Sequence, residues 1–142
     1  MFKPNKRLEK KQKVKEWLQS IIYFRQEVAI KKAILDELLE VEKAAEEMGK
    51  NWRQVELAKQ LNELRDTLLK DVTALLELKN KVKKAIDTFE DPRLRIIFHE
   101  KYFKNQTWED IADKMFFSVI HIKRLAENGY FILTNSIFME SV

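Results

Sequence analysis

The sequence contains few of the residues that interrupt helices. Its 142 residues include only 2 glycines and 2 prolines, whereas glycine alone usually makes up about 7% of a globular protein. Because tight turns depend on these residues, few hairpins can form, which excludes β-sandwiches, barrels and multi-stranded α/β folds. The absence of cysteine excludes a disulfide framework, a thiolate nucleophile and cysteine-ligated metals. We therefore predict an all-α fold.

Long apolar runs are missing as well. No uninterrupted apolar stretch of the sequence approaches the ~20 residues that span a bilayer. Residues 1–15 are basic, but they are not followed by the apolar core of a signal peptide. We therefore expect no membrane partner and a cytoplasmic location.

Catalytic signatures are also scarce. The two histidines are His99 and His121, and no carboxylate cluster shares their spacing, so we expect neither a metal site nor a cofactor. A glycine-rich phosphate loop, a G-x-S-x-G motif and an H-E-x-x-H motif do not occur in the sequence. The chain is therefore not expected to be an enzyme.

The positive charge is concentrated at the start of the chain. The formal net charge is +4, and residues 1–20 carry seven cations against Glu9 and Glu16, whereas residues 91–142 carry seven charges of each sign. A basic arm can attract nucleic acid or another polyanion, although basic helix ends are also common on solvated surfaces. The seven cations are Lys3, Lys6, Arg7, Lys10, Lys11, Lys13 and Lys15.

Residues 7–48 have the periodicity of one long amphipathic helix. Apolar residues recur in a heptad-like pattern that Lys31 and Glu42 interrupt. A glycine just past the last periodic residue favours the end of a helix, and Gly49 stands at that place. The apolar positions are Val14, Trp17, Leu18, Ile21, Phe24, Val28, Leu35, Leu38, Leu39 and Ala45.

A second amphipathic helix is predicted from Trp52 to about Glu90. Its apolar positions are Leu57, Leu61, Leu64, Leu68, Val72, Leu75, Leu78, Val82, Ile86 and Phe89. Two such helices can fold back as an antiparallel hairpin, or they can pair with another chain as a coiled coil. The sequence leaves this choice open.

Asp91-Pro92 indicates the start of a further helix, because aspartate is a good N-cap and proline fits the first helical position. Its apolar residues are Leu94, Ile97, Phe98 and Tyr102, and Asn105-Gln106 closes it. We place a domain boundary here, which gives a helical hairpin or coiled coil over residues 1–90 and a small trihelical domain over residues 91–142.

Residues 107–125, TWEDIADKMFFSVIHIKRL, have the pattern of a helix-turn-helix. Thr107 caps a short helix in which Ile111, Ala112 and Met115 face inward. Phe116 and Phe117 form the turn, which lacks the glycine often found there. Ser118 caps a further helix with Ile122 and Leu125 facing inward.

The run DPRLRIIFHEKYFKNQTWEDIADKMFFSVIHIKRL resembles the DNA-binding helices of region 4 of sigma factors. It is more closely similar to phage-encoded regulators with a region-4-like domain, the ArpU/RinA-type late-gene activators and their relatives. The residues that carry the resemblance are Asp91, Pro92, Tyr102, Trp108, Glu109, Ile111, Ala112, Phe117, Ser118, Ile122, Arg124 and Leu125.

The resemblance implies that the chain binds double-stranded DNA with the helix that begins at Ser118 in the major groove. The exposed residues of this helix would face the DNA, and Arg124 would contact a phosphate or a guanine. The helix N-termini at Thr107 and Ser118 would offer backbone N–H groups to phosphates. The DNA-binding residues implied in this way are Thr107, Ser118, Val119, Ile120, His121, Lys123 and Arg124.

Three features depart from the pattern of the relatives. Val119 and Ile120 stand where relatives carry polar or basic residues, so base reading there would rely on thymine methyl groups. Gly129 is expected to end the helix near Asn128. The apolar tail over residues 130–142 is expected to pack on the domain as a closing helix or strand, or to contact a partner.

The resemblance thus implies a transcriptional regulator of phage or prophage origin that binds DNA, and we expect it to form a homo-oligomer through its helical region. RNA polymerase is a further candidate partner. The alternative is a module for protein interaction without a role in DNA binding, in which the hairpin and the sigma-like domain dock on a host or phage protein.

Overall fold

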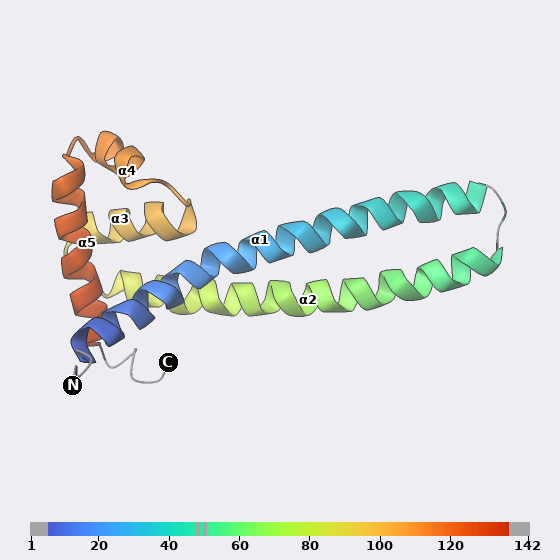
Figure 1. The fold of residues 1–142 in the computed structure, drawn as a ribbon, viewed down its shortest axis with the longest axis horizontal. Coiled ribbons are helices and arrows are strands. Elements are labelled where there is room, and N and C mark those ends of the chain that lie inside the picture. The colour runs from blue at the N-terminus through green and yellow to red at the C-terminus, as the bar shows by residue number, and fades with distance from the viewer. Residues whose placement is uncertain (1–5, 48, 50, 137–142) are drawn as a thin grey trace, which may run out of the picture. The chain divides into compact units, whose positions relative to one another are not determined.

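The computed structural model describes residues 6–47, 49 and 51–136. At residues 6, 7 and 51–54 it describes the backbone but not the side chains. The described chain folds into five α-helices and one short π-helical segment, which confirms the all-α fold (Figure 1). The elements are α1 (Lys6–Glu47), α2 (Asn51–Asp87), α3 (Pro92–Phe98), η1 (His99–Phe103), α4 (Trp108–Met115) and α5 (Val119–Thr134).

The break between the two long helices lies at Gly49, as predicted. Gly49 has a φ of +70°, a left-handed conformation that glycine adopts without the steric cost of a Cβ atom. Its N–H donates to the carbonyl of Glu46 at 3.1 Å. The second helix then starts at Asn51. Trp52, which the sequence placed at this helix start, has its side chain outside the described residues.

The chain divides into two compact units, one made of residues 1–22 and 78–142, the other of residues 23–77. The first unit thus draws on both ends of the chain. The sequence predicts a boundary near Asp91 between parts that fold independently. Independent folding is not tested by this division, so that boundary stays a prediction.

Within residues 23–77, α1 and α2 pack against each other as an antiparallel hairpin. Leu61 and Leu75 are buried, and the other apolar positions facing the seam are half-buried. Lys31, which interrupts the first apolar stripe, forms an ion pair with Asp71 of α2. Of the two pairings that the sequence left open, this part of the chain has the intramolecular one. The half-buried positions include Phe24, Val28, Leu35, Leu38, Leu57, Leu64, Leu68 and Val72.

The unit of residues 1–22 and 78–142 has a core that every one of its helices lines. Its centre is an aromatic cluster around Phe98, whose ring lies 5.0 Å from Phe89 and 5.1 Å from Tyr130 between centroids. The hydroxyls of Tyr102 and Tyr130 share a buried hydrogen bond of 2.5 Å. Further buried residues are Val14, Leu18, Ile21, Val82, Ile86, Leu94, Ile97, Ile111, Ile122, Leu125 and Leu133.

The prediction that Gly129 ends the last helix is wrong, because α5 continues through Gly129 to Thr134. A Cβ atom at Gly129 would lie 2.3 Å from Cε2 of Phe98, which is far inside van der Waals contact. Glycine is therefore required at this position for the close approach of α5 to Phe98. Part of the apolar tail thereby joins the core through Tyr130 and Leu133, while residues 137–142 lie outside the described residues.

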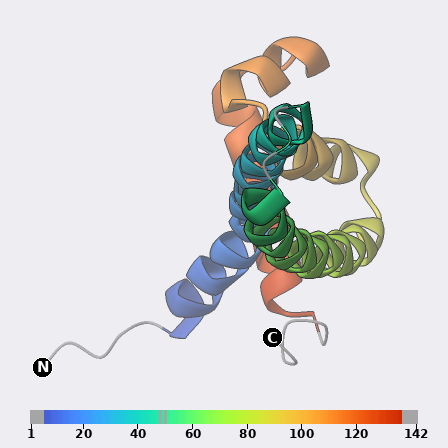
Figure 2. The same ribbon diagram turned by 90° about the vertical axis from the view of Figure 1, so that its right-hand side faces the viewer.

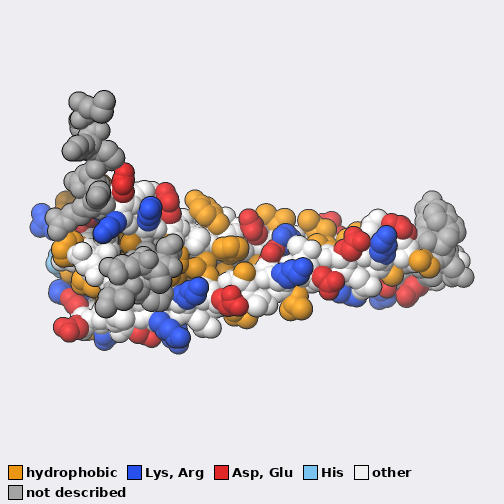
Figure 3. All heavy atoms as spheres, turned by 90° about the horizontal axis from the view of Figure 1, so that it is seen from below, with side chains coloured by type: hydrophobic (Ala, Val, Ile, Leu, Met, Phe, Trp, Pro, Cys, Tyr) orange, Lys and Arg blue, Asp and Glu red, His pale blue; other side chains and the backbone are white. Residues whose placement is uncertain are grey.

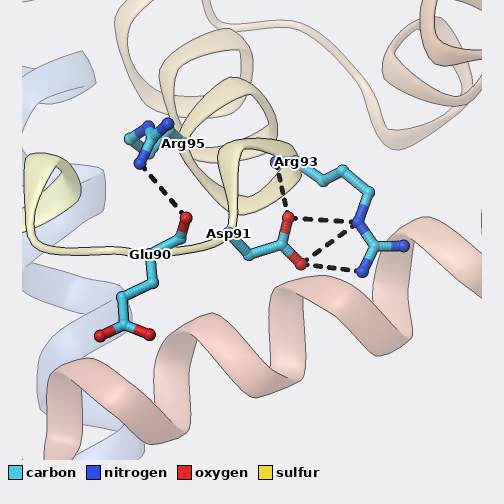
Figure 4. Close-up of polar contacts among 4 residues, drawn as sticks. All are labelled: Glu90, Asp91, Arg93 and Arg95. Atoms are coloured by element: carbon cyan, nitrogen blue, oxygen red, sulfur yellow. Dashed lines mark hydrogen bonds and ion pairs between the residues drawn. The ribbon is translucent and has the colours of Figure 1, made fainter.

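The junction before α3 is fixed by two arginines (Figure 4). The carboxylate of Asp91 accepts the backbone N–H of Arg93 at 2.9 Å and Nη2 of Arg93 at 2.8 Å, and these hydrogen bonds lower the pKa of Asp91 below its usual value. Nη1 of Arg95 donates to the carbonyl of Phe89 at 2.6 Å. The predicted helix start at Pro92 is therefore confirmed.

The sequence did not predict the π-helical segment η1, which follows α3 and contains the buried Glu100. Burial would raise the pKa of Glu100, but hydrogen bonds from Lys114 and Lys104 outweigh it and hold the pKa below its usual value. Nζ of Lys114 lies 2.8 Å from Oε1 of Glu100, and Nζ of Lys104 lies 3.3 Å from it. The carboxylate therefore ties η1 to α4.

Candidate nucleic-acid interface

Helices α4 and α5 follow each other across a short turn, at the place where the sequence predicts a helix-turn-helix. Oγ1 of Thr107 accepts the N–H of Asp110 at 3.1 Å, and Oγ of Ser118 accepts the N–H of His121 at 3.1 Å. Both hydroxyls thus satisfy N–H groups at the starts of their helices. Both predicted helix starts are confirmed. The predicted inward residues are buried except for Met115, which is half-buried; the buried ones are Ile111, Ala112, Ile122 and Leu125.

The turn between the helices is closed without glycine. Phe116 takes the left-handed conformation with a φ of 60°, and the N–H of Phe117 donates to the carbonyl of Ala112 at 3.0 Å, as in a Schellman motif. The side chain of Phe116 is 94% exposed. A non-glycine residue in this conformation destabilises the fold by about 1–2 kcal/mol. Because the ring of Phe116 is exposed, its burial does not offset this destabilisation.

The first turn of α5 presents apolar rather than polar side chains. The ring of His121 packs edge-to-face on Phe117 with 4.7 Å between centroids, so this histidine is half-buried rather than exposed as expected. Val119 is also half-buried. Ile120, in contrast, is 67% exposed.

The exposed predicted contacts on α5 share one side of the helix. Lys123 and Arg124 are exposed and follow Ile120 by three and four residues, a spacing that places side chains on one helix face. We call Ile120, Lys123 and Arg124 the outer face of α5. Thr107 is exposed at the N-terminus of α4.

Lys101 is a cation of this unit that the sequence analysis missed. Its Nζ lies 4.6 Å from the centroid of the Trp108 ring, in the arrangement of a cation–π contact. Burial lowers the pKa of Lys101, Glu109 raises it, and the nearby Lys123 lowers it further. The charges of Lys101 and Lys123 therefore repel each other. The sequence indicates this lysine only as a basic residue before Tyr102. Basic residues at such positions are too common to predict a binding role.

The basic arm belongs to the same unit as α4 and α5. Lys11 forms an ion pair with Glu127 of α5, and Nζ of Lys15 lies 4.0 Å from the same carboxylate and 4.9 Å from the centroid of the Tyr130 ring. The first turns of α1 therefore lie beside α5 (Figure 2). Lys3, Lys6 and Arg7 have side chains outside the described residues.

This grouping changes the charge of the candidate interface. Residues 91–142 alone are neutral, but the unit of residues 1–22 and 78–142 contains 18 Lys and Arg against 11 Asp and Glu, a net charge of +7. Residues 23–77 contain the other 9 Lys and Arg and 12 Asp and Glu, a net charge of −3. The positive charge of the protein therefore resides in the unit that carries α5.

The described residues contain cavities but no cluster of metal ligands. They contain no group of three or more His, Asp or Glu side chains placed to hold a metal ion. Within the same residues, no buried side-chain nitrogen or oxygen lacks a hydrogen-bond partner. An open cavity of about 560 Å³ lies between the end of α2, α3 and η1, with Lys83, Arg95, His99 and Phe103 in its lining. None of the predicted DNA-binding residues lines it.

Among the described residues, no helix is both long enough and apolar enough to cross a membrane. The chain matches no protein-family model, no curated protein and no solved structure. Its function therefore has to be argued from its own residues.

Proposed function

We propose that the protein is a regulator of transcription that binds double-stranded DNA with α5 in the major groove. The observation that carries the proposal is the convergence of charge on one unit. The helix-turn-helix, the cations Lys123 and Arg124, and the ion-paired start of α1 all belong to a unit of net charge +7. Because phosphate neutralisation supplies most of the non-specific affinity for DNA, such a unit is suited to a duplex.

The outer face of α5 supports a role at the groove rather than in the core. Lys123 and Arg124 are exposed on the side of α5 opposite to buried Ile122 and Leu125. Cations in this position neutralise phosphates, and an arginine can also bind guanine through two hydrogen bonds. The resemblance to phage regulators adds a phage or prophage origin to the proposal, with RNA polymerase as a further partner.

We also propose that the protein self-associates through residues 23–77. Apolar side chains remain exposed along both helices of this unit, and several reach the surface in Figure 3. On α1 they recur after seven, four and seven residues, which is a heptad-compatible spacing. A second copy of the hairpin would cover them. They are Tyr23, Ile30, Ile34, Val41, Val55, Leu69 and Leu76, with exposed fractions of 44–74%.

Changing Lys123 and Arg124 together to alanine tests the DNA-binding proposal. We expect weaker binding to duplex DNA, by a few kcal/mol at most, and a salt dependence whose slope falls by about one for each lost phosphate contact. The measurement is fluorescence anisotropy with labelled fragments from around the protein's own gene at two salt concentrations.

The matched control changes Lys32 and Lys43 to alanine. Both are exposed in the unit of residues 23–77, so this variant loses the same total charge while the outer face stays intact. If both variants lost affinity equally, α5 would not be the contact. If the wild type did not bind duplex DNA, the module for protein interaction would become the better explanation.

A further inference from the structure

We infer that the protein distinguishes base pairs by apolar contact between Ile120 and the 5-methyl group of thymine. The inference rests on the proposed function and names the base chemistry that α5 would read. Its basis is an exposed apolar side chain at the position of a helix-turn-helix that normally meets base edges.

The polar side chains at the start of α5 already have partners inside the protein. Oγ of Ser118 accepts the N–H of His121 at 3.1 Å. The imidazole of His121 packs on Phe117 with 4.7 Å between ring centroids. Among residues 119–121, Ile120 is therefore the exposed side chain, while Val119 and His121 are half-buried.

Ile120 is the outward side chain of this turn, and it does not contribute to the core. It is 67% exposed, whereas Ile122 two residues later is fully buried. Isoleucine is also a weaker helix former than the straight-chain residues, so neither packing nor helix propensity accounts for it here.

The charges around Ile120 make DNA the fitting occupant of this face. Lys123 and Arg124 follow at the spacings that place them beside Ile120, and both are exposed. Cations on the same face as an apolar residue suit a groove, whose phosphate walls are anionic and whose floor carries the bases. An apolar protein surface would offer those cations no counter-charge.

The major groove contains one apolar group that varies with sequence, the C5-methyl of thymine. A deoxyuridine has the same hydrogen-bonding edge but lacks this methyl group. Burying a single methyl group strengthens binding by about 4-fold. Replacement of the contacted thymine by uracil should therefore weaken binding by about that factor.

The experiment uses the full-length protein and one duplex of about 20 base pairs, two helical turns, selected from a randomised pool by retention on the protein. Each thymine of that duplex is replaced in turn by deoxyuridine, and anisotropy gives the dissociation constants. We expect a loss of about 4-fold at one or two positions for the wild type and no change at those positions for Ile120→Ala. The control Ile96→Ala, at a 45%-exposed position of α3, should keep the wild-type sensitivity.

Three results would overturn the inference, and they differ in what they leave standing. If the wild type bound the selected duplex but every deoxyuridine substitution were neutral, thymine reading would be excluded while DNA binding would stand. If Ile120→Ala kept the sensitivity, another residue would be the reader. If the protein bound no duplex of the randomised pool, DNA binding itself would be excluded, and the outer face of α5 would have to serve a protein partner.

Discussion

Gly129 and Phe116 occupy positions where the usual residue preferences are reversed. A glycine in the middle of α5 would ordinarily weaken the helix, yet it admits the ring of Phe98 against the backbone. A phenylalanine in the left-handed turn would ordinarily be a glycine, yet Phe116 stands there with a φ of 60°. The first is explained by packing within the unit. The second has no packing explanation, since the side chain is 94% exposed.

Gly129→Ala should destabilise the protein by about 1–3 kcal/mol, because the added Cβ atom overpacks a filled core. Thermal unfolding followed by circular dichroism measures the change. Adding Phe98→Leu should recover part of the loss. Gly49→Ala is the control, since its Cβ would meet no atom within 4 Å and its cost comes from backbone conformation alone. If Phe98→Leu also rescued Gly49→Ala, the steric explanation would be excluded.

Phe116→Asn should stabilise the protein by up to about 1 kcal/mol, because asparagine tolerates the left-handed conformation better than phenylalanine. Phe116→Ala keeps the backbone strain and should leave the free energy of unfolding near that of the wild type. Chemical denaturation measures both. A large loss in Phe116→Ala would mean that the ring packs against the protein after all.

At the scale of elements, η1 and α4 are held together by the carboxylate of Glu100. Its side chain is 7% exposed, whereas the two lysines that bind it are 49% and 55% exposed. One buried acceptor thus fixes the π-helical segment η1 against α4. The packing of α4 therefore depends on a charge as well as on the apolar core.

Glu100→Gln should destabilise the protein by about 1 kcal/mol at neutral pH, because two charge-assisted hydrogen bonds become neutral ones. The pKa of Glu100 is lowered in the folded state, so its contribution is complete above the unfolded pKa of about 4.3 and is lost as the pH falls through the folded pKa. Denaturation curves of both proteins should therefore converge in acid. A difference that stayed constant down to low pH would contradict this role.

The sequence predicted the long elements well and the short ones partly. Heptad spacing and Gly49 indicated α1 and α2, and the caps at Asp91, Thr107 and Ser118 indicated the three later helix starts, because these signals are local. The predicted end of α5 was wrong, because Gly129 allows the close approach of Phe98, which lies far away in the sequence. The buried role of Glu100 and the contact of Lys101 with Trp108 depend on partners that no local pattern specifies.

At the scale of the whole molecule, the net charge is divided between the two units. Residues 1–22 and 78–142 carry the positive excess, while residues 23–77 carry a negative excess and the exposed apolar side chains of the hairpin. This division matches a protein that binds a polyanion with one unit and another copy of itself with the other.

Leu69→Lys should reduce self-association without unfolding the hairpin, because Leu69 is 66% exposed. Sedimentation equilibrium gives the mass, and circular dichroism gives the helix content. Leu61→Lys is the contrasting variant, since Leu61 is 1% exposed and a buried unpaired charge should unfold the hairpin. A monomeric wild type would exclude the proposal, and an unchanged mass in Leu69→Lys would place the interface elsewhere.

The ion pair between Lys11 and Glu127 joins residues that are 116 positions apart in the sequence. Contacts of such long range form late, because the intervening chain must first be ordered. The hairpin of residues 23–77 can form from nearer neighbours while the ribosome is still making the rest of the chain. The unit that carries the positive charge is completed only when α5 emerges, so the proposed surface for DNA forms after the hairpin that carries the proposed surface for self-association.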